Sequence, residues 1–512
     1  MMESFGPKSE TKYMIVRADY LLSMSEEEGA EERIEDGYVL GEGSTIKECG
    51  HYTPEIGERI LKEYGDDLTI VGKDITNTTK EQIPKLKAAI LPGFVKAHGH
   101  DHEATIIGIC KDMPLVDWLD GAINPFTRFL SEKREELEAK FGKSANLIAY
   151  RKARVDDLSY GITTALTHHC NFNKYYVPDL VHANLEMGTK MIIAVGSQDR
   201  NYDPRVLDLP VELATQRLDK YWDQFKDTPR TWVIPGPDQV FSNGPEILKQ
   251  QKEWSEKHGT LIHIHSAEEY GTTQWFREKY KMTEVEFLES IGFLSKDTML
   301  AHQVHSTDHD LELIAKYGVK IVHNPLANTI LGSGMPDIVK MRSMGIDVAI
   351  STDGSGSADN QNILAAARLA SQYQRGLHHD AKRVPAIDAL KMITAIPGKM
   401  LRLKVGQVRV GYDMDLAVID LTRPNLIPTS KRNVVENLIW ASDGSEARWV
   451  IANGVLLRDN YSFTKANTTE IFADITELQA MFMDFLATQK IVKATGKRAE
   501  EGEEEKKEEK KE

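Results

Sequence analysis

The 512-residue sequence contains only three cysteines, Cys49, Cys110 and Cys170, and they lie far apart in the chain. Three scattered cysteines exclude a disulfide framework and a CxxC metal site. No stretch approaches the ~20 uncharged apolar residues that a membrane-spanning helix requires. The N-terminal residues carry early charges and lack an apolar segment, so no cleaved secretion signal is expected. The sequence therefore predicts a cytoplasmic protein.

Basic residues are fewer than acidic ones: the chain has 63 Lys and Arg and 78 Asp and Glu, which give a formal net charge of −15. A surplus of this sign repels nucleic acid phosphates and anionic membranes, so neither is an expected partner. Part of the surplus lies in residues 497–512, a charged run that we expect to be a solvated, disordered tail. With 41% hydrophobic and 28% charged residues, the whole chain has the composition of a globular protein with a large core.

Eight short apolar runs, bounded by Gly, Pro or polar residues, occupy the middle of the chain. Such runs are typical of buried parallel strands. Amphipathic stretches such as 177–187, 245–257 and 308–316 separate them and predict helices. This repeated alternation predicts an α/β fold, a (β/α)8 TIM barrel over residues 89–400. The expected strands are Ala89–Ala97, Thr163–Thr167, Met191–Gly196, Trp232–Pro235, Leu261–His265, Met299–His302, Lys320–His323 and Asp347–Ser351.

The segments that flank this region are β-rich. Residues 10–88 and 401–460 carry strand patterns punctuated by glycines, as in hairpins. We expect the two segments to pair as one small β-sandwich-like domain. Residues 470–493 have a helical spacing of apolar residues and predict a C-terminal helix. The expected flank strands are Tyr13–Leu22, Gly37–Ile46, Gly406–Asp420 and Arg448–Leu457.

Histidines occupy the ends of the first and fifth predicted strands, and the carboxyl ends of barrel strands are where active sites lie. His98 and His100 are two residues apart, so both side chains point to the same side and can reach one ion. In the fifth strand, His263 and His265 share a face, but His265 is nearer the carboxyl end. We therefore expect His265 to be a ligand and His263 to be a core residue behind it. Glu268 follows where the strand turns toward a helix, a position suited to proton transfer.

The sixth, seventh and eighth strands also end in residues that can bind metal, namely His302, His323 and Asp353. A single histidine with apolar neighbours is usually a core residue, but five strand ends in barrel register favour a functional site. Three histidines and one aspartate that leave a position open for water suit Zn²⁺ or Fe²⁺ in hydrolysis.

Several motifs resemble those of the amidohydrolase superfamily, and most closely its cytosine deaminase and triazine hydrolase branch. The motifs are the run LPGFVKAHGH, the HxxE of His265 and Glu268, the later AHxVH and HNPxxN, and the final STDG. The C-terminal segments VGYDMDLAVIDL and VIANGVLL are similar to the small β domain of that branch. The resemblance covers roughly residues 13–460 and is specific because all the motifs occur together.

The resemblance implies a role for each matching residue. His98, His100, His265 and Asp353 become the metal ligands, and Glu268 becomes the proton shuttle. His302 would orient the attacking water, and Asp353 would share in proton handling. The fourth strand lacks the bridging lysine of two-metal members, which implies one divalent ion, Zn²⁺ in the first place and Fe²⁺ as the alternative.

The implied activity is hydrolytic deamination of an amino-substituted nitrogen heterocycle, such as a purine, pterin, pyrimidine or s-triazine. Two alternatives remain open. One is hydrolysis of a cyclic amide, a urea-like group or an aryl halide on the same scaffold, and the other is an inactive scaffold. The expected partner is a small heterocyclic substrate, and we expect a homo-oligomer, a dimer or larger. The candidate substrate contacts are His323, Asn324, His169, Gln198, Asp101 and Trp118.

Overall fold

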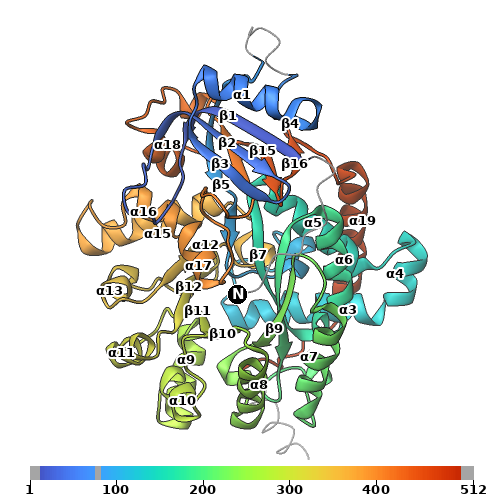
Figure 1. Ribbon diagram of the computed structural model, residues 1–512. Helices are drawn as coiled ribbons and strands as arrows, with labels where there is room; N and C mark the ends of the chain where they lie inside the picture. Colours follow the sequence, from blue (N-terminus) through green and yellow to red (C-terminus); the bar gives the residue numbers. More distant parts are fainter. Residues whose placement is uncertain (1–11, 75–81, 497–512) are drawn as a thin grey trace, which may run out of the picture.

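The structure is a computed structural model that describes residues 12–74 and 82–496. It is an α/β protein with three β-sheets, two of them parallel and the third mixed (Figure 1). The charged run 497–512, predicted to be a disordered tail, lies outside the described residues. Among the helices that the structure describes, none is long and apolar enough to cross a membrane.

Two four-stranded parallel sheets form the centre of the molecule, and each of the eight predicted apolar runs contributes one strand to them. A parallel bridge between Gln239 and His265 links the two sheets at one junction. At the other junction, the Ser351 hydroxyl donates to the His98 carbonyl over 2.6 Å. The strands are β6 (Phe94–Lys96), β7 (Ile162–His169), β8 (Lys190–Ser197), β9 (Thr231–Pro237), β10 (Ile262–Ser266), β11 (Thr298–His302), β12 (Lys320–His323) and β13 (Val348–Ile350).

Helices follow each parallel strand, as the amphipathic stretches predicted. The longest connection follows β6 and contains several short helical segments that lie near the carboxyl ends of the strands. Its elements are η2 (Asp101–Thr105), α2 (Leu115–Trp118), η3 (Leu119–Ile123), α3 (Asn124–Glu132), α4 (Arg134–Phe141) and α5 (Ala145–Ser159). The other connections include α6 (Val177–Met187), α7 (Glu212–Phe225), α8 (Pro245–His258), α9 (Tyr270–Tyr280), α10 (Glu284–Ser290), α11 (Asp308–Tyr317), α12 (Pro325–Ile330), α13 (Ile338–Ser343), α14 (Ser355–Ala358), α15 (Ile363–His378), α16 (Ala386–Lys391) and α17 (Ala395–Met400).

The prediction of one continuous strand over Ala89–Ala97 is wrong, because the chain changes sheets at Gly93. Residues Leu86–Pro92 form β5, which pairs with β1 and β14 in the mixed sheet, whereas β6 begins at Phe94. A Cβ at Gly93 would lie 2.2 Å from the Thr163 hydroxyl, so only glycine fits this close passage. The apolar run is continuous because both strands are buried, and this hides the boundary in the sequence.

Strands from both flanks pair in one nine-stranded mixed sheet, whose order is β17-β16-β15-β14-β5-β1-β2-β3, with β4 beside β1. The N- and C-terminal segments meet where β14 runs antiparallel to β5. Val16, Ile90, Val418 and Ile451, which come from both flanks, belong to one buried apolar cluster, so the two flanks share a core. The strands are β1 (Tyr13–Leu21), β2 (Ile34–Glu42), β3 (Thr45–His51), β4 (Leu68–Ile70), β5, β14 (Leu416–Asp420), β15 (Ala447–Ala452), β16 (Val455–Asp459) and β17 (Ser462–Phe463).

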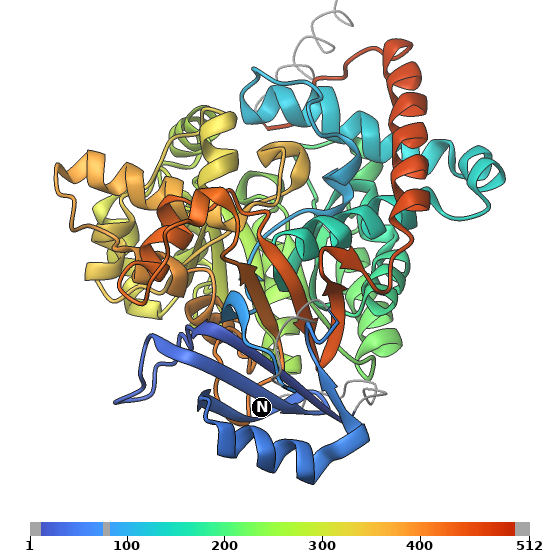
Figure 2. The ribbon, with the colours of Figure 1, turned by 90° about the horizontal axis from the view of Figure 1, so that it is seen from above.

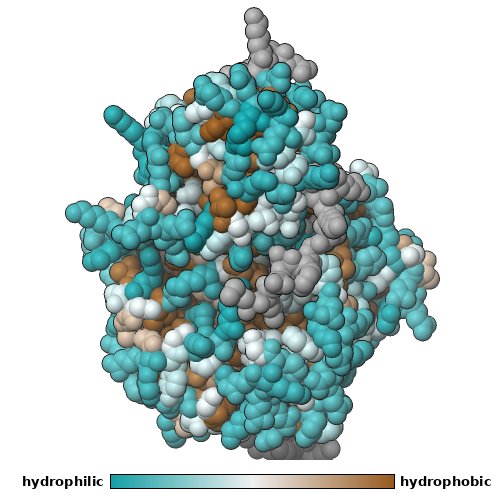
Figure 3. Space-filling model, in the orientation of Figure 1, coloured by the Kyte–Doolittle hydropathy of each residue, from teal (hydrophilic) through white to brown (hydrophobic). Residues whose placement is uncertain are grey.

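The C-terminal helix α19 spans Thr468–Ala487 and packs beside the long connection after β6, as Figures 1 and 2 show. Its buried Leu478 and Phe482 share an apolar cluster with Phe126 and Phe129 of α3. The helix ends at residue 487 rather than 493, and an irregular segment continues to Gly496. The face of the molecule in Figure 3 is mostly hydrophilic, with only scattered apolar residues.

Candidate metal centre and active site

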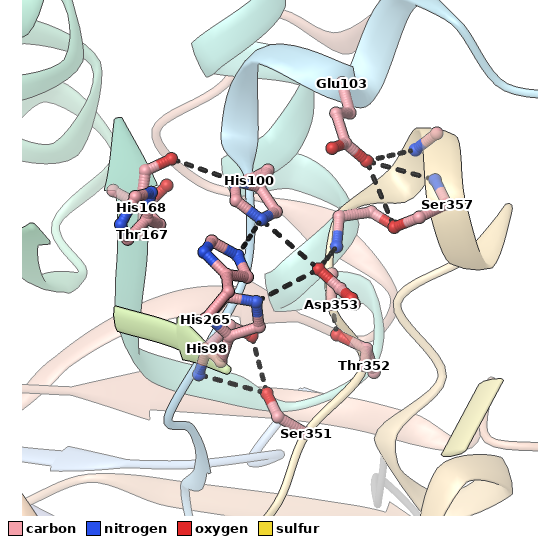
Figure 4. A network of polar contacts seen from close by, with 12 residues as sticks. His98, His100, Glu103, Thr167, His168, His265, Ser351, Thr352, Asp353 and Ser357 are labelled. Carbon is pink, nitrogen blue, oxygen red and sulfur yellow. Dashed lines mark hydrogen bonds and ion pairs between the residues drawn. The ribbon is translucent and has the colours of Figure 1, made fainter. Parts of the chain in front are cut away.

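Four predicted ligands converge at the carboxyl ends of the parallel strands (Figure 4). His98 Nε2 lies 3.2 Å from Asp353 Oδ1, and His100 Nε2 lies 3.5 Å from the same oxygen. The Nε2 atoms of His100 and His265 are 3.2 Å apart. All four residues are buried, with at most 8% of any of them exposed. Strands 1, 5 and 8 of the parallel series thus deliver their polar ends to one point.

The backbone around this point adopts conformations that L-residues rarely take. His302 and Asp353 have φ values of 74° and 71°, and Ala267, just before Glu268, has a φ of 49°. Residues held in the left-handed region away from glycine cluster at functional sites, where the surrounding structure fixes them. Each of the three lies just beyond a parallel strand or at its last residue, so the strands hold these turns in place.

The histidines are arranged as a cation-binding site requires. The His100 Nδ1 contacts the His168 carbonyl at 3.0 Å, and the His265 Nδ1 contacts the Asp238 carbonyl at 2.6 Å. These contacts place the proton on Nδ1 and leave Nε2 as a lone-pair donor. Within the described residues, neither ring nitrogen of His98 has a hydrogen-bond partner. One nitrogen from each of the three rings lies within 4.8 Å of the other two, which fits a single ion.

The electrostatic environment keeps these imidazoles neutral, which is the form that binds metal. Burial, together with neighbouring histidines, holds the pKa of His98 well below its usual range. Burial likewise lowers the pKa of His100 and of His265, although Asp353 and Asp238 oppose the shift. Buried ring nitrogens without hydrogen-bond partners are costly, and a shared cation would satisfy them. The donor set therefore fits the predicted divalent ion.

Glu268 and His302 lie beside the four predicted ligands. His302 Nε2 is 3.6 Å from Glu268 Oε2 and 3.7 Å from Asp353 Oδ2, and its Nδ1 is 2.8 Å from Asn328 Oδ1. The Gln239 amide donates to Glu268 Oε2 over 3.4 Å. Burial, and then the charge of Asp353, raises the pKa of Glu268 well above its usual range. The carboxyl therefore retains its proton more readily than a solvated glutamate.

A buried lysine holds the turn of Asp353 in place through Gln361. Lys96, which is 2% exposed, donates to Asp157 over 2.7 Å and to the Gln361 side-chain oxygen over 2.9 Å. The Gln361 amide in turn donates to the Asp353 carbonyl over 3.1 Å, and the Thr352 hydroxyl donates to Gln361 over 2.7 Å. A charge-assisted network of this kind fixes the turn that carries Asp353.

A cavity opens above this centre and has one apolar and one polar wall. The apolar wall comes from the long connection after β6 and from the end of α12, and the polar wall comes mainly from the strand ends. The apolar lining residues are Leu115, Trp118, Leu119, Ile123 and Leu331. The polar lining residues other than the predicted ligands include His102, Glu103, Cys170, Tyr202, Asp238, Gln239, Glu268, His302 and Ser357. The structure thus places Trp118 in the cavity wall, as predicted for a substrate contact.

The prediction that Asp101 contacts substrate needs correction. Asp101 is 2% exposed, does not line the cavity, and forms ion pairs with Arg154 and with Lys96, the latter at 3.7 Å. Its neighbour His102 points into the cavity instead. Residues 101–105 form the 3-10 helix η2, in which successive side chains point in different directions, so Asp101 faces the buried cations while His102 and Glu103 line the cavity.

Four other predicted contacts are buried near the site but do not line this cavity. His169 packs against Tyr150 on the far side of β7, because adjacent strand residues face opposite ways. Gln198 accepts a hydrogen bond from Lys174 over 3.2 Å and donates to Asp238 over 3.4 Å, behind the cavity wall. His323 and Asn324 are fully buried below His302, and burial lowers the pKa of His323 to about 3.

His263 lies deeper in the fold than the predicted ligands, as expected for a core residue. Its ring stacks on that of His98 with centroids 4.9 Å apart and an interplanar angle of 6°. It is fully buried and belongs to none of the groups of ligand atoms that the structure brings together.

Sequence reasoning missed Glu103 and Asn328. Glu103 Oε2 accepts hydrogen bonds from the backbone N–H groups of Gly356 and Ser357, both over 3.0 Å. Burial, and then the charge of Asp353, raises the pKa of Glu103 to about 8. The two residues lie on an irregular connection and in a short helix, so no strand register pointed to them. The only local signals were the acidic residue after HGHDH and the second asparagine of HNPLAN.

Comparison with known proteins shows the family to which this chain belongs. Residues 89–456 match the model of the amidohydrolase family, and the chain belongs to that family. A 5-methylthioadenosine/S-adenosylhomocysteine deaminase from Caldanaerobacter subterraneus subsp. tengcongensis is 29% identical over 464 residues, which are 90% of this chain and 96% of that protein. A 5'-deoxyadenosine deaminase from Methanopyrus kandleri is 27% identical and covers 82% of this chain and 95% of its own length.

Solved structures share the same fold. An atrazine chlorohydrolase from Arthrobacter aurescens, complexed with zinc, superposes with a TM-score of 0.80 at 22% identity and covers 91% of this chain and all of its own. An adenosine deaminase from Xanthomonas campestris with bound zinc has a TM-score of 0.75 at 18% identity, covering 92% of this chain and 98% of its own.

Proposed function

We propose that this protein is a metal-dependent aminohydrolase that releases ammonia from an amino-substituted nitrogen heterocycle. The observation that carries the proposal is the placement of Glu268 and His302 beside the centre of three histidines and Asp353, beneath a cavity with an apolar wall. A group that moves protons and a cation site then face the same small volume. The relatives named above, which are deaminases of adenosine derivatives, favour a 6-aminopurine nucleoside as the substrate.

His98, His100, His265 and Asp353 would hold one divalent ion, and Zn²⁺ is the first candidate because similar structures contain zinc. Such an ion lowers the pKa of a water ligand from 15.7 to about 7, which makes a nucleophile available at neutral pH. Fe²⁺ is the alternative, since imidazole and carboxylate ligands suit both metals.

Glu268 moves the proton in this proposal. Its Oε2 lies on the cavity side, 3.6 Å from His302 Nε2. The protonated carboxyl donates to a ring nitrogen of the substrate, which makes the adjacent carbon more electrophilic. The carboxylate that results accepts a proton from the attacking water, so one residue serves both transfers. Its raised pKa favours the protonated form that the first transfer requires.

His302 and the apolar wall position the reactants. The Nδ1 contact with Asn328 Oδ1 places a proton on that nitrogen and leaves Nε2 facing Glu268 and Asp353. His302 Nε2 can thus accept a hydrogen bond from the attacking water. On the opposite side, Trp118 and Leu119 provide flat and aliphatic surfaces against which a planar ring can pack.

The test is ammonia release from adenosine, 5'-methylthioadenosine, guanine and an amino-substituted triazine, with the metal content measured on the same preparation. We expect ammonia from at least one aminopurine, and loss of turnover after the ion is chelated. Chloride release from a chlorotriazine without ammonia from any amine substrate would replace deamination by the halide-hydrolase alternative. A preparation that holds its ion and turns over none of these compounds would contradict the proposal.

The architecture around the site is part of the same proposal. We propose that the two parallel sheets close into one (β/α)8 barrel, supported by the Gln239–His265 bridge and by the Ser351–His98 hydrogen bond at the two junctions. The mixed sheet would be a small β domain built from both flanks. A cytoplasmic homo-oligomer completes the proposal, and light scattering of the purified protein tests the oligomer.

A further inference from the structure

Cys170 follows β7 and lines the cavity, yet the proposed deamination does not use it. It is 5% exposed and a free thiol. Its Sγ belongs to a group with one nitrogen of His168 and one carboxylate oxygen of Asp238, all within 4.8 Å of one another. The same sulfur belongs to a second group of this size with His100 and His102. The thiol is thus the shared member of two potential ligand sets.

Two of the neighbouring imidazoles have unused ring nitrogens. His102 is 1% exposed, and among the described residues neither of its ring nitrogens has a hydrogen-bond partner. His168 is fully buried; its Nε2 is 3.3 Å from the Pro237 carbonyl, whereas its Nδ1 has no partner in the described residues. Buried polar atoms without partners are costly and require an explanation, such as an ion that the structure does not contain. His102 also lines the cavity beside Cys170.

We propose that Cys170, His168 and Asp238 form a second metal site, with His102 approaching the same sulfur from the side of the cavity. Sulfur, nitrogen and oxygen ligands of these kinds are those that Zn²⁺ binds, and three of them leave one tetrahedral position open. Thiolate also selects soft divalent ions over Mg²⁺ or Ca²⁺. The thiol releases its proton to solvent when the ion binds, so the ion displaces one proton.

The second site is separate from the predicted catalytic centre but touches it. His168 contacts the predicted ligand His100 through its carbonyl, and Asp238 contacts His265 in the same way. Neither residue contributes a side chain to the first ion's ligand set. An ion on Cys170 therefore leaves the ligands of the first site in place. It occupies space at the polar wall of the cavity, where the substrate would otherwise bind. We expect a second equivalent of zinc to inhibit turnover.

A purely structural role for Cys170 explains less of the site. A buried thiol beside Asp238 can donate a weak hydrogen bond to that carboxylate and fill space as a small hydrophobe. That role leaves both nitrogens of His102 and the Nδ1 of His168 without any partner in the described part of the chain. The metal site accounts for the thiol, for the carboxylate and for the Nδ1 of His168 together.

The test starts from protein that already holds one zinc per chain and titrates it with Co²⁺ and, separately, with Cd²⁺. Thiolate ligation of either ion produces a charge-transfer absorption in the ultraviolet, which reports on cysteine and not on the catalytic centre. We expect wild type to bind one further equivalent with this absorption. Cys170→Ser should bind that equivalent at least ~10-fold more weakly and without the absorption. Cys110→Ser is the matched control, because Cys110 is a free cysteine that does not line the cavity, and it should behave as wild type.

The binding result decides the proposal independently of any substrate. Absence of the thiolate absorption in wild type, or its persistence in Cys170→Ser, would overturn it. His102→Asn and Asp238→Asn provide a second route if Cys170→Ser fails to fold, and each should weaken the second equivalent while the first remains bound. For inhibition, the ratio of turnover with and without excess zinc is compared. That ratio should be below 1 in wild type and in Cys110→Ser, and closer to 1 in Cys170→Ser. Equal ratios in wild type and Cys170→Ser would contradict the inhibitory role.

Discussion

Glu284 holds the turn that carries Glu268, because its Oε2 accepts a hydrogen bond from the Ala267 backbone N–H over 2.6 Å. Ala267 has a φ of 49°, a conformation that a residue other than glycine adopts only under constraint. Glu284 is the first residue of α10 and is 4% exposed, so a helix from the next part of the chain supplies that constraint.

This contact predicts a pH dependence of stability. Burial raises the pKa of Glu284 to about 7 from its ordinary 4.5. The folded protein then binds this proton more tightly than the unfolded chain, so the contribution of Glu284 to stability falls as the pH rises from about 4.5 to 7. Glu284→Gln keeps an acceptor for Ala267 but cannot ionise. The free energy of unfolding of this variant, relative to that of wild type, should rise by up to about 3 kcal/mol between pH 5 and pH 8.

Urea unfolding at the two pH values checks this expectation. The quantity to compare is the difference in the free energy of unfolding between variant and wild type. A difference that is the same at pH 5 and pH 8 would show that Glu284 titrates normally in the folded protein. Glu286→Gln is the control variant. Glu286 lies two residues away in α10 and accepts a hydrogen bond from the Thr283 N–H, so its substitution should change stability by the same amount at both pH values.

Glu268→Gln should separate binding from chemistry. The amide keeps the size and the hydrogen-bonding capacity of the side chain but cannot shuttle a proton, so the ion should stay bound. General acid–base groups contribute about 10²–10⁴-fold, and turnover should fall by at least this factor because Glu268 serves two transfers. The loss should affect kcat more than KM. Steady-state kinetics with metal analysis of the same sample measure both.

Two neighbouring residues serve as controls for Glu268. Glu269→Gln changes a carboxylate that caps α9 by accepting the Gly271 and Thr272 N–H groups, and it should lower stability more than kcat. His263→Asn removes the ring stacked on His98 and should leave the metal content intact. If His263→Asn loses the ion and His265→Asn keeps it, the ligand assignment on β10 is wrong, and the role of Glu268 is wrong with it.

One tightly held divalent ion per chain should survive dialysis. Replacing His98, His100, His265 or Asp353 individually should abolish or greatly weaken its binding, since each supplies one ligand atom to the same point. Elemental analysis of wild type and the four variants makes the measurement. Two ions that both resist dialysis would contradict a single tight site, whereas a second ion that binds only when added in excess is the one inferred at Cys170.

The segment after α19 should stabilise the wall of the cavity. The Thr495 hydroxyl donates to Asp120 over 2.5 Å, and the Gly496 N–H donates to the Asn201 carbonyl over 2.9 Å, so this segment bridges η3 and the loop after β8. Thr495→Val leaves the buried Asp120 short of a donor and should cost about 1–3 kcal/mol. Differential scanning calorimetry of the variant checks this.

A pair of truncations locates the contribution of the C-terminus. Deleting residues 497–512 keeps every contact just named and should change neither melting temperature nor turnover, because the deleted run has almost no apolar residues. Deleting residues 488–512 also removes the contacts with Asp120 and Asn201, and should lower both the melting temperature and the turnover. Equal behaviour of the two truncations would show that the Asp120 and Asn201 contacts contribute nothing.

The sequence predicted which polar side chains lie at the strand ends, and the physical reason is periodicity. A buried parallel strand requires an unbroken apolar run, so a histidine at its carboxyl end, such as His98 or His265, is conspicuous. The two-residue repeat of a strand predicted that His98 and His100 point to one side, and the position of His265 nearer the carboxyl end of its strand favoured it over His263. Asp353 was noticed because it follows the eighth predicted strand. The choice of these four residues as the metal ligands came from the resemblance to the amidohydrolase superfamily.

Tertiary structure decided what local spacing could not. The break at Gly93 depends on the close approach of Thr163, a residue 70 positions away, and the continuous apolar run gave no sign of it. The burial of Asp101 depends on Lys96 at the end of β6 and on Arg154, whose positive charge reaches it only because α5 packs against η2. Loop residues have no periodicity, so their side-chain directions follow from packing alone.

The grouping of Cys170 with His168 and Asp238 is the clearest case of this kind. His168 and Cys170 lie at the end of β7 and just after it, whereas Asp238 follows β9, and in the sequence Cys170 is a single cysteine beside two histidines. Only the parallel alignment of β7, β8 and β9 brings the end of β7 beside the residue that follows β9. The sequence by itself determined which strand ends carry the predicted ligands, because each of these residues lies at the end of its own strand or just beyond it. The fold determined which side chains share a cavity, because that depends on distances between strands.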